Sequence, residues 1–249
     1  MLQLIGYSLH WQYLGWYVKV IVIDRMHQYA FYFDSTSCSG CKACQVACKG
    51  QNSPAVGVLW RRVYEVTGGG WEKVGSAWVS RVFSYNLSIA CNHCEKPICA
   101  EVCPTAAITK RADGIVLLDP KRCTGCKYCS WACPYGAPQF DAISGRMTKC
   151  DFCVERIDAG LPPACVAACP LRSLDFGERS ELEARYGVTP AIFPLPEASL
   201  TSPALVITPH RDAQRALTEQ AVVTNREEVN LERVQPVEVW DGVAEGANS

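Results

Sequence analysis

Sixteen cysteines dominate the chemistry available to this chain of 249 residues, and they form four quartets with no cysteine left over. Every quartet ends in Cys-x-x-x-Cys, and the third has the full spacing Cys-x-x-Cys-x-x-Cys-x-x-x-Cys-Pro, which holds [4Fe–4S] clusters through thiolates. Four repeats of one ligand pattern predict four clusters and electron transfer among them. The quartets are Cys38, Cys41, Cys44 and Cys48; Cys91, Cys94, Cys99 and Cys103; Cys123, Cys126, Cys129 and Cys133; and Cys150, Cys153, Cys165 and Cys169.

Two other uses of cysteine fit this spacing less well. A disulfide framework does not require the Cys-x-x-Cys and Cys-x-x-x-Cys spacings to recur in four quartets. Structural zinc sites usually pair two Cys-x-x-Cys units across a longer gap, whereas in the first and third quartets the third cysteine follows at once. A structural metal module that never changes its oxidation state remains the alternative from a different class. His93 lies inside a complete cysteine set, so we expect it to donate a hydrogen bond near a cluster sulfur rather than to bind iron.

The loops that present these cysteines have their own sequence signals. Gly40 and Gly125 precede the second cysteine of their quartets, where a tight turn needs a residue tolerant of positive φ. The fourth cysteine of each quartet is expected to begin a helix and to bind the neighbouring cluster, as in two-cluster proteins. From the residues alone, pairing the first quartet with the second is as acceptable as pairing it with the fourth.

Short strands and helices are predicted around the loops. Residues 29–34 and 114–119 form strands that lead into the first and third quartets, which indicates an internal repeat. Residues 61–66 and 78–84 form two strands joined at the glycines 68–70, and residues 179–186 form a helix. Beyond residue 187 the sequence is proline-rich and extended, and its polar end is expected to contact a partner or to remain mobile.

Charge and hydropathy exclude several classes of protein. The net charge of −1 gives no case for nucleic-acid binding, and the longest apolar runs are too short to cross a bilayer. Residues 1–23 make a poor signal peptide, because they lack a basic start and a clean apolar segment. An interfacial helix is one alternative for this segment. We interpret residues 1–25 as an extension, with Met26 as the natural start.

From residue 26 to about residue 209 the sequence resembles the iron–sulfur (beta) subunits of bacterial dimethyl sulfoxide reductases, which belong to the complex iron–sulfur molybdoenzymes. The resemblance implies an α+β fold with two double-cluster ferredoxin-like modules, an inserted β-hairpin and an extended C-terminal tail. It leaves residues 1–25 without a counterpart. The segments that carry the resemblance are residues 38–49, 88–94, 123–138, 147–151 and 169–177.

The resemblance also implies boundaries and cluster ligands. The first module takes residues 26–50 and 145–180, the hairpin region 51–84, the second module 85–144, and the helix with its partner-binding tail 181–249. Because Cys126 stands where nitrate reductases have a tryptophan, all four clusters are expected to be [4Fe–4S]. The implied ligand sets are Cys38, Cys41, Cys44 and Cys169; Cys48, Cys150, Cys153 and Cys165; Cys91, Cys94, Cys99 and Cys133; and Cys103, Cys123, Cys126 and Cys129.

The function implied is electron transfer in anaerobic respiration, by a non-catalytic subunit of an oxidoreductase complex. Its partners are a membrane anchor subunit that oxidises quinol and a catalytic subunit with a molybdenum bis-pterin site, and the complex lies on the outer face of the cytoplasmic membrane or, as the alternative, on its cytoplasmic face. A thiosulfate or polysulfide reductase or a formate dehydrogenase is the alternative enzyme. Cations beside the ligands either raise the cluster potentials or are ordinary surface side chains, and they are Lys42, Lys49, Arg122, Lys127 and Lys149.

Overall fold

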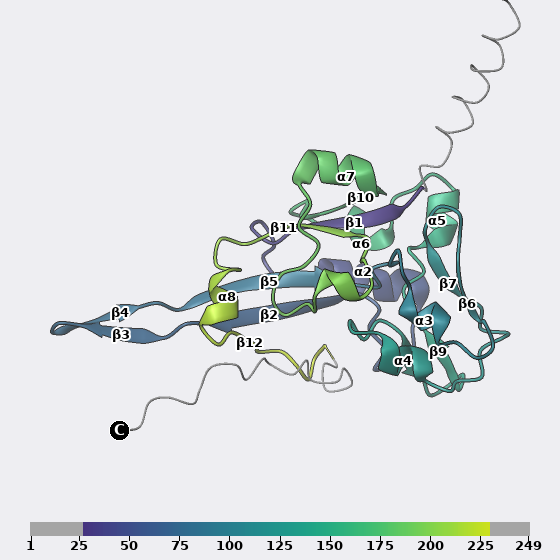
Figure 1. The fold of residues 1–249 in the computed structure, drawn as a ribbon, viewed down its shortest axis with the longest axis horizontal. Coiled ribbons are helices and arrows are strands. Elements are labelled where there is room, and N and C mark those ends of the chain that lie inside the picture. Colours follow the sequence, from purple (N-terminus) through teal and green to yellow (C-terminus); the bar gives the residue numbers. More distant parts are fainter. Residues whose placement is uncertain (1–26, 230–249) are drawn as a thin grey trace, which may run out of the picture.

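The computed structural model describes residues 27–229, so the predicted extension over residues 1–25 lies outside the described part of the chain. Short helices and short strands alternate in an α+β arrangement, as predicted (Figure 1). No helix within residues 27–229 is long and apolar enough to cross a bilayer.

The strand that leads into the first cysteine loop is the centre of a three-stranded sheet. β1 (Tyr29–Asp34) pairs antiparallel with β10 (Leu174–Glu178) and parallel with β11 (Leu205–Thr208). Both faces of β1 are buried because α7 (Arg179–Tyr186) covers one of them and the main core covers the other (Figure 1). The alternating residues of β1 therefore serve two cores. Ala30 and Tyr32 pack toward α7, whereas Phe31 and Phe33 join the main core.

A long antiparallel pair forms the second sheet and extends beyond it. β2 (Arg62–Gly68) pairs with β5 (Phe83–Ile89), and β12 (Val222–Val223) adds to the other edge of β2. The pair continues into β3 (Trp71–Val74) and β4 (Ala77–Ser80), which project from the body as a narrow arm (Figure 1). All eight residues of β3 and β4 are exposed.

The predicted hairpin is present, but its turn lies at a different place in the sequence. The chain does not reverse at glycines 68–70, because Val74 pairs with Ala77 and the reversal therefore falls on residues 75–76. At Gly69, φ is 74° and an added Cβ would lie 2.2 Å from the Arg81 carbonyl oxygen. Gly68 and Gly69 thus allow the two strands to approach closely at an irregular step in the hairpin, whereas nothing lies within 4 Å of a Cβ at Gly70.

The cysteine-rich part is built from one- to three-turn helices and two small hairpins. α2 (Ala43–Asn52) packs against α6 (Ala164–Ala167), and α3 (Ile98–Glu101) packs against α4 (Tyr128–Ala132). α5 (Val154–Asp158) follows the fourth cysteine loop. β6 (Ile108–Lys110) pairs with β7 (Val116–Leu118), and β8 (Gln139–Asp141) pairs with β9 (Arg146–Thr148). The predicted strand over 114–119 is therefore present as β7.

The segment after α7 packs against the protein itself as far as residue 229. It passes through a cis Phe193–Pro194 bond, the 3-10 helix η1 (Ala198–Leu200), β11, α8 (Arg215–Thr218) and β12. Asn225 fixes this segment to β2, because its amide oxygen accepts from Glu65 N at 2.9 Å and its Nδ2 donates to Val63 O at 2.9 Å. The predicted extended tail is thus partly structured, and residues 230–249 lie outside the described part.

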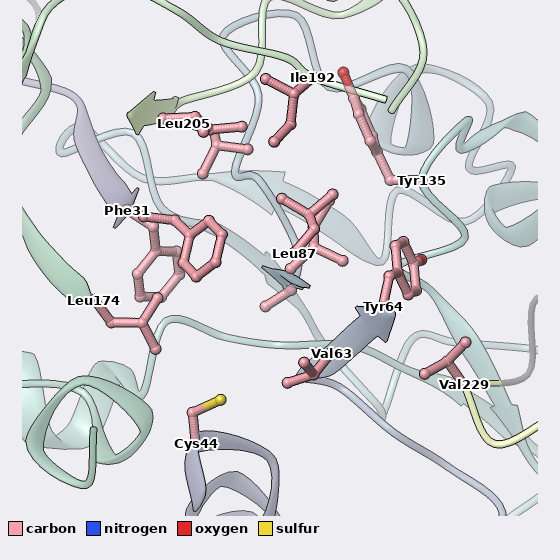
Figure 2. Close-up of a cluster of buried hydrophobic side chains, with 14 of the residues drawn as sticks. Phe31, Cys44, Val63, Tyr64, Leu87, Tyr135, Leu174, Ile192, Leu205 and Val229 are labelled. Carbon is pink, nitrogen blue, oxygen red and sulfur yellow. The ribbon is translucent and has the colours of Figure 1, made fainter. Parts of the chain in front are cut away.

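Phe152 lies at the centre of the main core, where the sheets meet the cysteine loops. The side chain is fully buried, and its ring stacks on Phe31 with centroids 4.1 Å apart. His93 meets the same ring edge-on at 5.1 Å. Figure 2 shows part of this core, in which Leu87 and Leu205 lie near Phe31 and Cys44 reaches the same cluster from α2.

The Phe152→Ala substitution is expected to lower the free energy of unfolding by about 3–5 kcal/mol, because it removes a buried ring and leaves a cavity. Chemical denaturation of the metal-loaded protein under anaerobic conditions measures this loss. Trp78→Ala is the matched control, since Trp78 is 64% exposed on the arm and its loss should change stability by about 0.5 kcal/mol or less. Equal losses for the two variants would contradict the central place of Phe152.

Candidate iron–sulfur sites

Three cavities in the structure are each lined by four cysteines, and in each the fourth cysteine comes from another quartet. The first has a volume of about 320 Å³, the second about 360 Å³ and the third about 280 Å³, open solvent at their mouths included. The lining cysteines are Cys38, Cys41, Cys44 and Cys169; Cys91, Cys94, Cys99 and Cys133; and Cys103, Cys123, Cys126 and Cys129.

The remaining four cysteines gather between α2 and α6, beside the fourth loop. Asn52 on α2 directs its Nδ2 at the sulfurs of Cys48 and Cys153, at 3.7 and 4.0 Å. Burial and the neighbouring thiols Cys165 and Cys153 raise the pKa of Cys48 to about 12. Burial, followed by the Cys48 charge, raises the pKa of Cys150 well above its usual value. The structure thus brings together each of the four sets that the family resemblance implies, and it does not bring the first quartet to the second.

All four loops share one turn. The residue just before the second cysteine has a left-handed φ in each quartet: 72° at Gly40, 42° at His93, 72° at Gly125 and 66° at Phe152. This turn folds the first two sulfurs toward the same cavity, and φ in this region is unusual for a residue as bulky as phenylalanine. The glycines were a readable signal for two of the loops. His93 and Phe152 give no such signal, and sequence reasoning missed them.

The fourth cysteine of each quartet does not begin a helix, contrary to the prediction. Cys48 lies within α2, Cys133 ends α4, and Cys103 and Cys169 follow α3 and α6. The third cysteine of each quartet is instead the second residue of a short helix, and the fourth follows about one turn later. The fourth sulfur nevertheless joins a different set from the first three.

Hydrogen-bond donors around the sulfurs fit a thiolate-bound cluster. Cys123 Sγ accepts hydrogen bonds from the backbone N–H groups of Gly125 and Met147, both at 3.4 Å. Asn92 lies on the wall of the second cavity, and its buried Nδ2 is close to Tyr135 but forms no hydrogen bond of standard geometry. An unpaired N–H donor beside four cysteines could donate a hydrogen bond to a sulfur atom of a bound cluster. Hydrogen bonds of this kind tune metal centres.

The electrostatics of the third cavity differ from one cysteine to the next. Burial raises the pKa of Cys129 to about 12. Burial also acts on Cys103, but hydrogen bonds from the Thr105 hydroxyl and from backbone N–H groups outweigh it and lower the pKa of Cys103. One of these bonds, from Ala107 N, is 3.2 Å long. Directed N–H groups therefore favour the anionic sulfur that iron binding requires.

The number of cysteines in each cavity fits a cluster. A [4Fe–4S] cluster is held by four cysteine thiolates, and each of the three cavities is lined by four cysteines. Within residues 27–229, no three His, Cys, Asp or Glu side chains come close enough together to share a single ion.

The hydrogen bond expected from His93 to a cluster sulfur stays a prediction, because the ring nitrogen that would donate it has no partner among the described residues. The His93 ring is fully buried, and Nδ1 accepts a hydrogen bond of 3.0 Å from Val116 N, so the proton is on Nε2. That Nε2 atom has no hydrogen-bond partner within the described residues. Burial, together with the nearby charges of Lys149 and Arg61, lowers the pKa of His93 well below its usual value. The residue therefore packs as a neutral ring against Phe152.

The five predicted cations differ in their surroundings. Lys42 forms ion pairs with Glu65 at 2.9 Å and with Glu228 at 2.6 Å, so its charge is largely compensated. Lys149 is buried, and its ammonium donates to the carbonyl oxygens of Val116 and Cys150. Of the other predicted cations, two are exposed, namely Lys127 over the Phe140 ring at 4.1 Å and Arg122, which donates to Thr105 O at 2.8 Å, whereas Lys49 on α2 is half-buried.

Comparison with known proteins finds similarity to an iron–sulfur domain and to the B components of several reductases. The model of a family described as a 4Fe-4S dicluster domain matches residues 82–179. The B component of anaerobic dimethyl sulfoxide reductase from Haemophilus influenzae is 47% identical over 205 residues, which cover 82% of this chain and all of that protein. The corresponding component from Escherichia coli is 46% identical over 81% of this chain and 98% of its own length. The B component of tetrathionate reductase from Salmonella typhimurium is 43% identical, over 57% of this chain and 55% of that protein.

The α+β fold, the cysteine-lined cavities and these matches define an electron-transfer protein that binds [4Fe–4S] clusters. Within that class, the protein belongs to the family of iron–sulfur subunits of anaerobic dimethyl sulfoxide reductases. Such proteins are components of multi-subunit reductases, so this one works with a catalytic partner.

Gly125→Ala is expected to destabilise the protein more than Gly145→Ala. Both glycines have positive φ, 72° and 67°, so both variants lose about 1–2 kcal/mol from the left-handed conformation. Only at Gly125 would the added Cβ also lie 2.3 Å from a backbone oxygen, that of Gly145, whereas nothing lies within 4 Å at Gly145. Denaturant unfolding measures both losses, and equal losses would show that the cluster loop is not held this tightly.

Proposed function

We propose that the protein holds four [4Fe–4S] clusters in series and transfers electrons between two partner subunits. When bound, such clusters supply one-electron transfer without making or breaking bonds in a substrate. The residues of this chain hold the clusters, bury them and direct hydrogen bonds at sulfur. The proposed ligand sets, numbered first to fourth, are Cys38, Cys41, Cys44 and Cys169; Cys48, Cys150, Cys153 and Cys165; Cys91, Cys94, Cys99 and Cys133; and Cys103, Cys123, Cys126 and Cys129.

The sets are neighbours in this order. The Arg61 guanidinium lies between cysteines of the first and second sets. His93, between Cys91 and Cys94, meets Phe152, just before Cys153, with ring centroids 5.1 Å apart, which connects the loop of the third set to that of the second. α3 connects the third set to the fourth, because it contains Cys99 and is followed by Cys103. In this proposal, the helix pair α2–α6 belongs to one double-cluster module and the pair α3–α4 to the other.

One observation carries the proposal: the first and the fourth sets each contain an exposed cysteine, whereas the second and third contain none. Cys41 is exposed in the first set, and Cys126 is exposed in the fourth. The other cysteines of all four sets are buried or half-buried. A series of centres with an exposed ligand in its two end members alone is suited to exchange electrons with two different partners.

The partners and the direction of electron flow follow the family resemblance. Electrons enter at the Cys126 end from a membrane anchor subunit that oxidises quinol. They leave at the Cys41 end toward a catalytic subunit with a molybdenum bis-pterin site. Reductases of the dimethyl sulfoxide type are favoured over the tetrathionate and formate branches, because identity over the full length of the relative is highest there.

We also propose that the complex lies on the outer face of the cytoplasmic membrane, held there through its anchor subunit. Protease treatment of intact spheroplasts tests this side. Cleavage of this protein without lysis supports the outer face, and cleavage only after lysis contradicts it.

Anaerobic analysis of the reconstituted protein is expected to find about sixteen iron and sixteen sulfide atoms per molecule, as four cubane clusters require. An EPR redox titration is expected to resolve four couples with mutual spin interaction. Zinc in place of iron, or clusters that do not change oxidation state, would make this a structural module and overturn the proposal.

In the assembled complex, Cys126→Ser is expected to abolish reduction of the terminal substrate by quinol, because it removes a ligand at the proposed entry. Reduction by a small viologen donor, which can reach the catalytic subunit directly, should be kept. Cys41→Ser should likewise block only the quinol route. A complex that keeps its quinol activity in either variant would contradict the series order.

A further inference from the structure

Arg61 is a buried cation in contact with cysteines of two different sets. It stands immediately before β2, and its side chain is only 2% exposed. Its Nη2 donates to Cys165 Sγ of the second set at 3.4 Å. Its Nη1 donates to Ser88 Oγ at 3.4 Å, and Ser88 Oγ lies 3.4 Å from Cys44 Sγ of the first set. A continuous line of three polar contacts thus connects the two sets.

The charge of Arg61 has no carboxylate partner in the described part of the chain. None of the ion pairs within residues 27–229 includes it, and its Nε has no hydrogen-bond partner. The guanidinium lies over the Phe31 ring at 4.6 Å, which offsets only part of the cost of removing a charge from water. An unpaired buried cation needs negative charge nearby, and the group in contact with it that becomes anionic on binding iron is the sulfur of Cys165.

We propose that Arg61 is the shared counter-cation of the first and second clusters and raises the reduction potentials of both. This inference rests on the proposed function, because it assumes that both sets hold redox-active clusters. Reduction adds a negative charge to a cluster, and a fixed positive charge nearby stabilises the reduced form. The guanidinium is suited to this role because it stays protonated and presents several donors at once.

The next residue provides a matched control. Arg62 is equally buried at 1% exposure, but it points the other way and donates from Nη2 to the Tyr135 carbonyl oxygen at 2.6 Å. It makes no hydrogen bond to a cysteine sulfur within the described residues, and its charge acts on Cys133 of the third set. Replacing Arg62 therefore removes the same charge from the adjacent position without touching the first two sets.

The test is an EPR redox titration of Arg61→Gln, Arg61→Lys and Arg62→Gln in the cluster-loaded protein. Parallel Cys41→Ser and Cys153→Ser samples identify the signals of the first and second clusters. Arg61→Gln is expected to weaken reduction of both at least tenfold in the equilibrium constant, which is about 59 mV for one electron. Arg61→Lys, which keeps the charge, should stay within about threefold of the natural protein, and so should Arg62→Gln at these two clusters.

Four couples unchanged by Arg61→Gln would overturn the inference, and so would an equal shift of the first two couples in Arg62→Gln. If Arg61→Gln does not load clusters, Arg61→Lys decides the matter. Normal loading and potentials in Arg61→Lys support a role of the charge, whereas loss of loading points to a packing role and overturns it. A natural protein without redox-active clusters would instead contradict the proposed function itself, which keeps the two failures distinguishable.

Discussion

Sulfurs that must act together lie far apart along the chain, and the rest of the fold depends on meeting that constraint. Cys169 joins the cavity formed by the first loop, and Cys133 joins the cavity formed by the second. Later segments of the chain must therefore pack beside the first strand, and β10 and β11 do so on either side of β1. The sheets are small because their task is to bring four loops to one place.

Charge is the second constraint, since the cysteine sets concentrate negative sulfur in the interior. The protein meets it partly with N–H groups directed at sulfur, as at Cys103 and Cys123. It also buries Arg61, Arg62 and Lys149, none of which forms an ion pair within residues 27–229. Such burial is costly in an ordinary apolar core. Around clusters that carry net negative charge, the same cations become stabilising.

Cysteine spacing predicted the chemistry well, because ligand spacing is a local property that the sequence displays directly. The strand at residues 29–34 and the helix at 179–186 were also predictable from local pattern. Arg61 could not be found in this way, since nothing local distinguishes a buried arginine from a surface one. The reversal of the hairpin was misplaced at three glycines, because a close approach of strands and a turn both favour glycine. Left-handed turns at His93 and Phe152 are imposed by the loop rather than by residue type.

The exposure of Cys41 and Cys126, which suits electron exchange with partners, also makes these two residues sensitive to oxidation. Solvent-accessible thiolates are the first to react with oxygen species, and their higher oxidation products cannot be reversed. In the proposed arrangement, oxidative damage therefore begins at the two terminal centres and reaches the interior ones later. A molecule that has lost one terminal centre is disconnected from a partner while most of its iron is still in place. Iron content is thus a poor measure of how much of a sample stored in air still functions.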